Sequence, residues 1–280
     1  MKKIEKNKKI NAISIDQISL MIPIKANTLD NNETPDEVQA IKHMFQFNKI
    51  LGKPEEQNHG LNGYTNSLRY GNDSAKILIM WSWRQTWMGV TVMFYGQGKK
   101  LYESLAKMNE INIDWFDIIN QVCVKFKGHV SRIDIAVDLI NYGFSVNSIA
   151  EKLKDDSYEF LNGKTKRKIS LEKMKTIGDS GEIDTIYVNS RKSDAYLRIY
   201  NKQKQGLSNK KSGYYTQAKN TQDWIRVEGE FKHREAHKIG NDLAQLVDSS
   251  KMHSYLVECI TRHWILTIKD KEDDGEKEGA

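Results

Sequence analysis

The sequence predicts an α+β protein, with a largely antiparallel central sheet and helices packed on one face. Segments that alternate as strands do are mixed with segments of helical spacing along the 280 residues. Several strand-like pairs are joined by short turns, as in hairpins. A parallel sheet would require a regular strand–helix–strand order, and the sequence does not show one. A chain of this length can bury a sizeable core.

The first half of the chain divides into six predicted elements. In order these are a strand (11–24), a helix (34–47), a hairpin (59–83), a strand (89–96) and two helical segments (97–111 and 114–126). The first helix has Thr34 as its N-cap and Pro35 at its first position, where proline is favoured. The hairpin turns at residues 71–73, which read Gly-Asn-Asp.

The second half continues the same mixture. It contains a strand (129–140), a helix (145–156), a hairpin (184–190 with 195–202), a strand (223–233) and two helices (238–249 and 252–266). We predict one domain over residues 13–268. The charged ends, residues 1–12 and 269–280, lack apolar periodicity and are predicted to be flexible and disordered.

Composition indicates a protein that binds a polyanion. The formal net charge is +6, and no acid occurs from Ala195 to Gln222. Clustered lysines favour phosphate contacts, although a solvated lysine-rich surface is the alternative. The two cysteines offer neither a disulfide framework nor a zinc pair. No apolar run approaches a membrane span and no signal peptide is present, so we expect a cytoplasmic protein with no membrane contact.

Two predicted strands carry carboxylates on one face. Alternation places Arg132, Asp134 and Asp138 together, and likewise Arg226, Glu228 and Glu230. Cross-strand arginine–carboxylate pairs in a half-exposed sheet would explain either strand alone. Four clustered carboxylates repel one another unless a cation lies among them, and such oxygen donors select Mg²⁺ or Mn²⁺. The metal candidates are therefore Asp134, Glu228 and Glu230, then Asp138, and more distantly Asp16. Gly229 predicts a bulge that would decide which glutamate faces the metal.

A third strand presents a tyrosine among cations. Alternation in "AYLRIYNKQKQ" places Arg198, Tyr200 and Lys202 on one face. If this strand neighbours the acidic ones, the combination suits phosphoryl transfer, with the phenol as nucleophile and the cations stabilising phosphoryl charge. A sheet tyrosine that hydrogen-bonds at a rim is the alternative.

The segments "VSRIDIAVDL", "AYLRIYNKQKQ" and "WIRVEGEFKH" resemble, in order and spacing, the signature strands of the Rep-trans family. That family comprises initiators of rolling-circle plasmid replication, with relaxase relatives in integrative conjugative elements. The resemblance covers roughly Ile13 to Trp264. It implies a metal-dependent nicking and closing enzyme in which Tyr200 attacks one origin phosphodiester, becomes linked to the 5′ phosphate and frees a 3′-hydroxyl.

The resemblance also implies partners. These are origin DNA, double-stranded with an extruded or single-stranded nick site, a host helicase and a second copy of the chain. We expect Arg132, Arg226, Lys204, Lys210 and Lys211 to contact DNA, the lysines from a basic loop over residues 202–219. Three alternatives stay open: a relaxase of a conjugative element, a non-catalytic DNA-binding protein on the same scaffold, and a metal-dependent nuclease that uses water.

Overall fold

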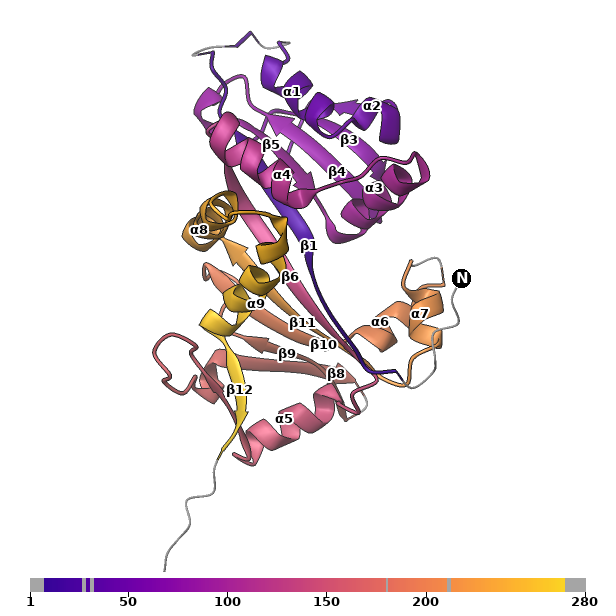
Figure 1. The fold of residues 1–280 in the computed structure, drawn as a ribbon, viewed down its shortest axis with the longest axis vertical. Helices are drawn as coiled ribbons and strands as arrows, with labels where there is room; N and C mark the ends of the chain where they lie inside the picture. The colour runs from indigo at the N-terminus through magenta and orange to yellow at the C-terminus, as the bar shows by residue number, and fades with distance from the viewer. Residues whose placement is uncertain (1–7, 27–28, 31–32, 180, 211–212, 270–280) are drawn as a thin grey trace, which may run out of the picture.

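The protein, seen in a computed structural model, is built on one long antiparallel sheet (Figure 1). The structure describes residues 8–26, 29–30, 33–179, 181–210 and 213–269. Ten strands follow the order β2-β3-β4-β5-β1-β6-β11-β10-β9-β8, and β12 pairs separately with β7. The predicted α+β class with a largely antiparallel sheet is confirmed.

The strands are β1 (Ile10–Ile22), β2 (Glu55–Gln57), β3 (Asn66–Asn72), β4 (Ala75–Trp81), β5 (Val90–Phe94), β6 (His129–Ile140), β7 (Tyr158–Leu161), β8 (Met174–Asp179), β9 (Glu182–Val188), β10 (Ala195–Asn201), β11 (Trp224–Lys232) and β12 (Ile265–Ile268). The helices are α1 (Asp36–Met44), α2 (Phe47–Ile50), α3 (Gly96–Met108), α4 (Trp115–Asn120), α5 (Val146–Lys154), α6 (Lys202–Leu207), α7 (Tyr215–Lys219), α8 (His233–Ala244) and α9 (Met252–His263). Short helical turns are η1 (Thr86–Met88), η2 (Gln121–Lys125), η3 (Leu171–Lys173) and η4 (Ser249–Lys251).

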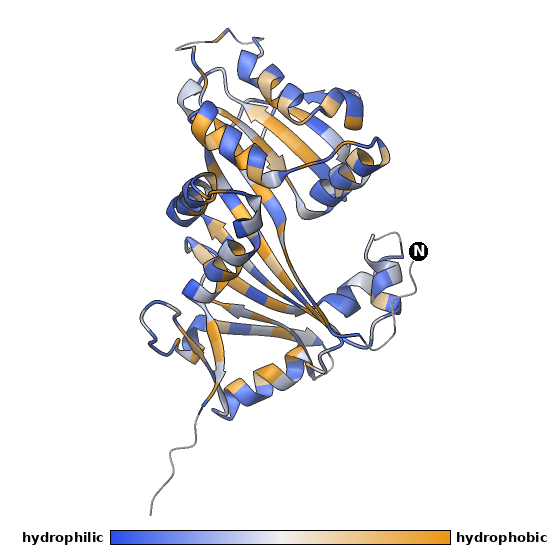
Figure 2. Cartoon of the chain, viewed as in Figure 1, coloured by the Kyte–Doolittle hydropathy of each residue, from blue (hydrophilic) through white to orange (hydrophobic). Residues whose placement is uncertain are grey.

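The sheet has one apolar face, which α8 and α9 cover across β6 and β11. Alternate residues such as Ile133 and Ile135 of β6 and Phe231 of β11 are fully buried there, beneath α8 and α9. The alternation is visible as changing colour along the strands in Figure 2. Burying a side chain of this size contributes about 1.5–3 kcal/mol. This apolar face therefore holds the strands in register and leaves the opposite face free to carry polar groups.

A β-bulge in β1 re-aims one acidic side chain. Ile15 pairs with Ile135 of β6 but Gln17 pairs with Asp134, so Asp16 is an extra residue on its strand. Such a bulge shifts the phase of the alternation by one residue. As a result both Asp16 and Gln17 reach the polar face, while Ile15 and Ile18 both stay on the apolar face.

Gly229 does not form the bulge that the sequence predicts. The pairing of β11 with β6 and β10 runs without a shift through Gly229. A Cβ at this position would lie 2.6 Å from Cδ1 of Ile260 in α9 and 2.9 Å from the Phe231 ring. The glycine therefore allows α9 to pack closely on the sheet, and Glu228 and Glu230 share the polar face.

The lysine-rich segment after β10 begins and ends in short helices, so the prediction of a loop over residues 202–219 is wrong for these two parts, whereas Lys210 lies in the non-helical connection between them. Lys202 begins α6 instead of continuing the strand, because the Asn201 side chain caps this helix by accepting from the Lys204 backbone N–H at 2.8 Å. Together α6 and α7 pack at the polar face. A small cluster of Ala218, Trp224 and Ile140 holds them there, apart from the helices of the apolar face.

The predicted flexible ends lie mostly outside the described residues. Ile10 to Ala12 are an exception, since they begin β1 and pair with β6. Among the described helices, none combines the length and the apolar character that crossing a bilayer requires.

Candidate active site

The polar face of β10, β11 and β6 carries a ladder of facing charged side chains. The pairing registers place Tyr200 opposite Arg226 and Arg198 opposite Glu228. On the other side of β11, Arg226 faces Asp138 and Glu230 faces Asp134. Because facing Cβ atoms in a sheet lie ≈ 4.5–5.5 Å apart, the predicted tyrosine strand and the two acidic strands share one site.

Tyr200 lies at the centre of this ladder with little contact to solvent. Its side chain is 6% exposed, and its hydroxyl donates to Oε2 of Glu228 at 3.2 Å. The Arg198 guanidinium lies 4.5 Å from the ring centroid and donates to the other oxygen of Glu228 at 2.6 Å. Burial, and then the charge of Glu228, raise the pKa of Tyr200 above its ordinary value. The phenol therefore holds its proton here and points it at a carboxylate.

Lys202 adds a buried cation next to the phenol. Its Nζ is 3.5 Å from the Tyr200 hydroxyl and donates to Gln205 at 2.7 Å. Burial, with repulsion from Arg226, lowers the pKa of Lys202 to about 8. Although Lys202 is helical rather than in the strand, the structure brings it to the tyrosine, as the sequence predicted for all three residues.

Arg226 is an internal partner of two aspartates. It is 2% exposed, donates twice to Asp138 at 2.7 and 2.8 Å, and donates to Asp16 at 2.6 Å. Asp138 also accepts from the Trp224 indole at 2.7 Å. Arg226 was expected to contact DNA, and the structure instead places it where it neutralises Asp138 and Asp16.

A cavity of about 200 Å³ opens beside this ladder. Four carboxylates line it, those of Asp16, Asp134, Glu228 and Glu230, together with Arg132, Arg198 and Tyr196. Asp138 and Tyr200 are not part of its lining. Arg132 donates to Asp134 at 2.8 Å and to Glu230 at 2.6 Å. Burial, with repulsion from Glu228 and Glu230, raises the pKa of Asp134 to about 7 against the opposing effect of Arg132.

The donor chemistry of this cavity fits a hard divalent cation. Its carboxylates are the oxygen ligands that Mg²⁺ and Mn²⁺ prefer. The pKa of Asp134 is raised first by burial and then by repulsion from Glu228 and Glu230, and a cation would relieve that repulsion. Within the described residues, however, no three acidic, histidine or cysteine side chains converge as ligands of one ion. Each carboxylate is instead paired with an arginine.

Two further residues, Tyr214 and Lys100, close the other side of the site. Tyr214 precedes α7, and two lysines lie over its ring. Nζ of Lys100, from α3, is 3.2 Å from the ring centroid, and Nζ of Lys202 is 4.1 Å from it. Its ring also packs edge-on against Trp224. Burial, with repulsion from Arg226, lowers the pKa of Lys100 to about 8. No local pattern identifies Lys100, because only the tertiary fold brings α3 to α7.

The remaining predicted DNA contacts lie apart from this ladder. Lys204 is exposed on α6 and forms an ion pair with Asp184 of β9. The acid-free stretch from Ala195 to Gln222 therefore finds an acidic partner on a neighbouring strand. Lys210 is exposed without an ion pair among the described residues. Lys211 lies outside the described residues.

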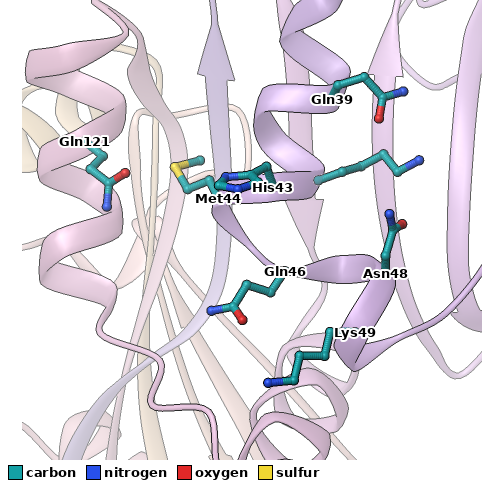
Figure 3. Close-up of a pocket in the computed structure, with 8 residues that line it drawn as sticks. Gln39, His43, Met44, Gln46, Asn48, Lys49 and Gln121 are labelled. Atoms are coloured by element: carbon teal, nitrogen blue, oxygen red, sulfur yellow. The ribbon is translucent and has the colours of Figure 1, made fainter.

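A larger cavity, of about 670 Å³, lies in the first half of the chain (Figure 3). Amide and basic side chains such as Gln39, Gln46 and Lys49 line it, and its described lining contains no carboxylate and no tyrosine. The carboxylates and arginines of the ladder therefore lie at the smaller cavity and not at this one.

Comparison with known proteins gives a family match and a similar fold. Residues 128–279, more than half of the chain, match the family model described as "Replication initiation factor". The fold is similar to the solved structure of a rolling circle replication initiator protein from Geobacillus stearothermophilus. The TM-score is 0.66 at 19% sequence identity, and the match covers 95% of this chain and 90% of that chain. A sequence search of curated proteins gives no match.

Proposed function

The chain belongs to the replication initiation factor family, and on that premise we propose that it starts rolling-circle replication by cutting one strand of origin DNA with Tyr200. The observation that supports this proposal most is the hydrogen bond from the buried Tyr200 hydroxyl to Glu228, with Arg198 and Lys202 beside it. A nucleophile, a proton acceptor and cations for a phosphate are thus brought together.

In the proposed reaction the Tyr200 oxygen attacks the phosphorus of one phosphodiester. The new oxygen–phosphorus bond forms as the bond from phosphorus to the 3′ oxygen breaks. The phenol proton passes to Glu228, and the departing 3′ oxygen takes a proton from solvent to become the hydroxyl that primes synthesis. Because one phosphodiester replaces another, the reverse reaction can reseal the strand without ATP.

The electrostatics of the site act in two ways in the proposed reaction. Burial and Glu228 raise the pKa of Tyr200, which keeps the phenol protonated while the site is empty of substrate. Arg198 and Lys202 stabilise the charge that develops on the phenol and on the phosphoryl oxygens. Lys202, with a pKa of about 8, keeps most of its charge at neutral pH.

We further propose that Asp134, Glu228 and Glu230 hold Mg²⁺ or Mn²⁺. A cation bound there would supply Lewis-acid polarisation of the phosphoryl oxygens. Asp138 and Asp16 are assigned a separate role, which is to neutralise Arg226. The homodimer and the host helicase remain predictions from the family resemblance.

The test uses the purified full chain, supercoiled DNA carrying the cognate origin, and Mg²⁺ or Mn²⁺. We expect nicked circles and a protein–DNA adduct that survives SDS, both lost in excess EDTA. Tyr200→Phe should bind DNA but form no adduct. Tyr196→Phe is the matched control, since Tyr196 lies on the same face of β10 and is also buried, yet it lacks the hydrogen bond to Glu228.

Two open alternatives give different results. A non-catalytic DNA-binding protein would shift DNA in a gel and leave no adduct. If the protein is a nuclease that uses water, the Tyr200→Phe variant would still cut DNA, and no covalent protein–DNA adduct would form in either protein. Either result would overturn the assignment of Tyr200.

A further inference from the structure

We propose that a second cavity on the polar face binds a base of the single-stranded DNA that is cut. This cavity, of about 500 Å³, lies over β4, β5, β1 and β6, next to the active-site cavity. Arg132 lines both cavities, so a strand held at one can continue into the other. The inference rests on the proposed function and adds a recognition site to it.

The lining of this second cavity has the composition that a base and its phosphate require. Its described lining contains no acidic residue, and Arg132 and Lys232 stand at one side of it. The floor is apolar and adaptable because it contains four methionines, Met21, Met80, Met88 and Met93. An apolar floor suits the flat face of a base, and the cations suit the phosphate attached to it.

An exposed tryptophan stands at this cavity. Trp87 of η1 is 76% exposed, although the other tryptophans are buried or half-buried. Leaving such a large ring in water has no benefit for folding, and Trp87 contributes little to the core. Aromatic rings on single-strand binding surfaces stack on bases of any sequence. Trp87 is placed to stack on a base that enters the cavity.

A buried hydroxyl offers a polar contact at the floor. Ser19 of β1 lines the cavity, is 1% exposed, and its hydroxyl has no hydrogen-bond partner among the described residues. An unpaired buried hydroxyl is costly, so its presence needs an explanation. A base edge, which carries donors and acceptors, would satisfy this hydroxyl.

The position along the sheet separates this cavity from the reacting atoms. Tyr200 is level with Arg226 and Asp138, and Arg132 lies six residues away along β6. At ≈ 3.3 Å per residue this separation is roughly 20 Å. The cavity therefore holds a base several nucleotides from the cut phosphate and contributes to recognition, not to the chemistry.

Photocrosslinking tests this location directly. The probes are short single-stranded oligonucleotides in which one thymine at a time is replaced by iodouracil, used with the full-length Tyr200→Phe protein so that no strand is cut. We expect crosslinks to Trp87 for one or two adjacent positions. Crosslinks confined to residues outside this cavity would overturn the proposal.

Affinity for the same oligonucleotides, measured by fluorescence anisotropy in the Tyr200→Phe background, separates the cavity from the chemistry. Trp87→Ala should weaken binding about ten-fold or more, as loss of one base stack does. Ser19→Ala should weaken it several-fold without lowering Tm, since the hydroxyl bonds no described residue. Phe144→Ala, an exposed aromatic at a cavity on the apolar face, is the control and should bind as the parent does.

Equal affinity of Trp87→Ala and the parent would overturn the base site. Because cutting is absent from these measurements, failure of the wild-type protein to form an adduct would reject the proposed function and leave this result standing.

Discussion

The polar face of the sheet differs between its two halves. Across β6, β11 and β10 it carries arginines and carboxylates in facing pairs around Tyr200. Across β4, β5 and β1 the same face carries methionine, serine and threonine around a cavity with an exposed Trp87. The apolar face is continuous beneath both halves. One scaffold thus separates a charged surface suited to phosphate chemistry from a neutral surface suited to bases.

The largest predicted effect is a loss of stability when Arg226, in the charged half of the polar face, is replaced. Arg226→Met leaves Asp138 and Asp16 without their buried partner, and loss of one member of a buried ion pair costs about 3–5 kcal/mol. Denaturant unfolding should show this loss. Arg198→Met is the matched control, because Arg198 pairs with a single carboxylate and its side chain is 30% exposed, so it should lose less. Equal losses would show that Arg226 has no special structural role.

The second prediction concerns the pH dependence of stability. Asp134 holds its proton in the fold up to about pH 7, whereas in the unfolded chain it ionises near 3.8. Between these values the folded state binds more protons, so the free energy of unfolding falls as pH rises. Asp134→Asn removes this contribution. Relative to wild type, the variant should gain stability from pH 4 to 7. A stability difference that is constant over this range would contradict the assignment.

A third prediction tests the packing beneath the ladder. Gly229→Ala places a methyl 2.6 Å from Cδ1 of Ile260, and overpacking of this kind costs about 1–3 kcal/mol. Ile260→Val removes that atom, so the double variant should recover part of the loss. Additive losses in the double-mutant cycle would mean that the glycine serves some other purpose.

The smallest predicted effect concerns the lysines beyond β10. Lys210→Gln should reduce the dependence of DNA affinity on salt by ~0.9 in the log–log slope if Lys210 contacts one phosphate. Lys204→Gln should change the slope less, since Lys204 already pairs with Asp184. Binding titrations over a salt series measure both, and a larger change for Lys204 would reverse this ranking.

Alternation along the strands predicted much of the candidate site. It placed Arg198 with Tyr200, and Glu228 with Glu230, on one face, because period-two side chains in a sheet leave little freedom. The bulge at Asp16 also left a signal. The apolar series Ile13, Ile15, Ile18, Leu20 and Ile22 steps by three residues between Ile15 and Ile18. A step of three within a period of two marks an extra residue.

Alternation along the strands could not predict site residues whose positions depend on packing between distant segments. Lys100 comes from α3 and Tyr214 from the segment before α7, and only the folded chain brings them together over Lys202. The sequence predicts a bulge at Gly229 because the atom that requires a glycine there, Cδ1 of Ile260, belongs to a helix distant in the sequence. Trp87 has no neighbouring motif that marks it as a binding residue.

The most direct test of the central proposal identifies the residue that carries the DNA. Wild-type protein is allowed to react with origin DNA, the adduct is digested with nuclease and protease, and the nucleotide-bearing peptide is sequenced by mass spectrometry. The proposal predicts a phosphodiester on Tyr200. A phosphodiester on Tyr196 or Tyr214, or cut DNA with no modified peptide, would contradict it.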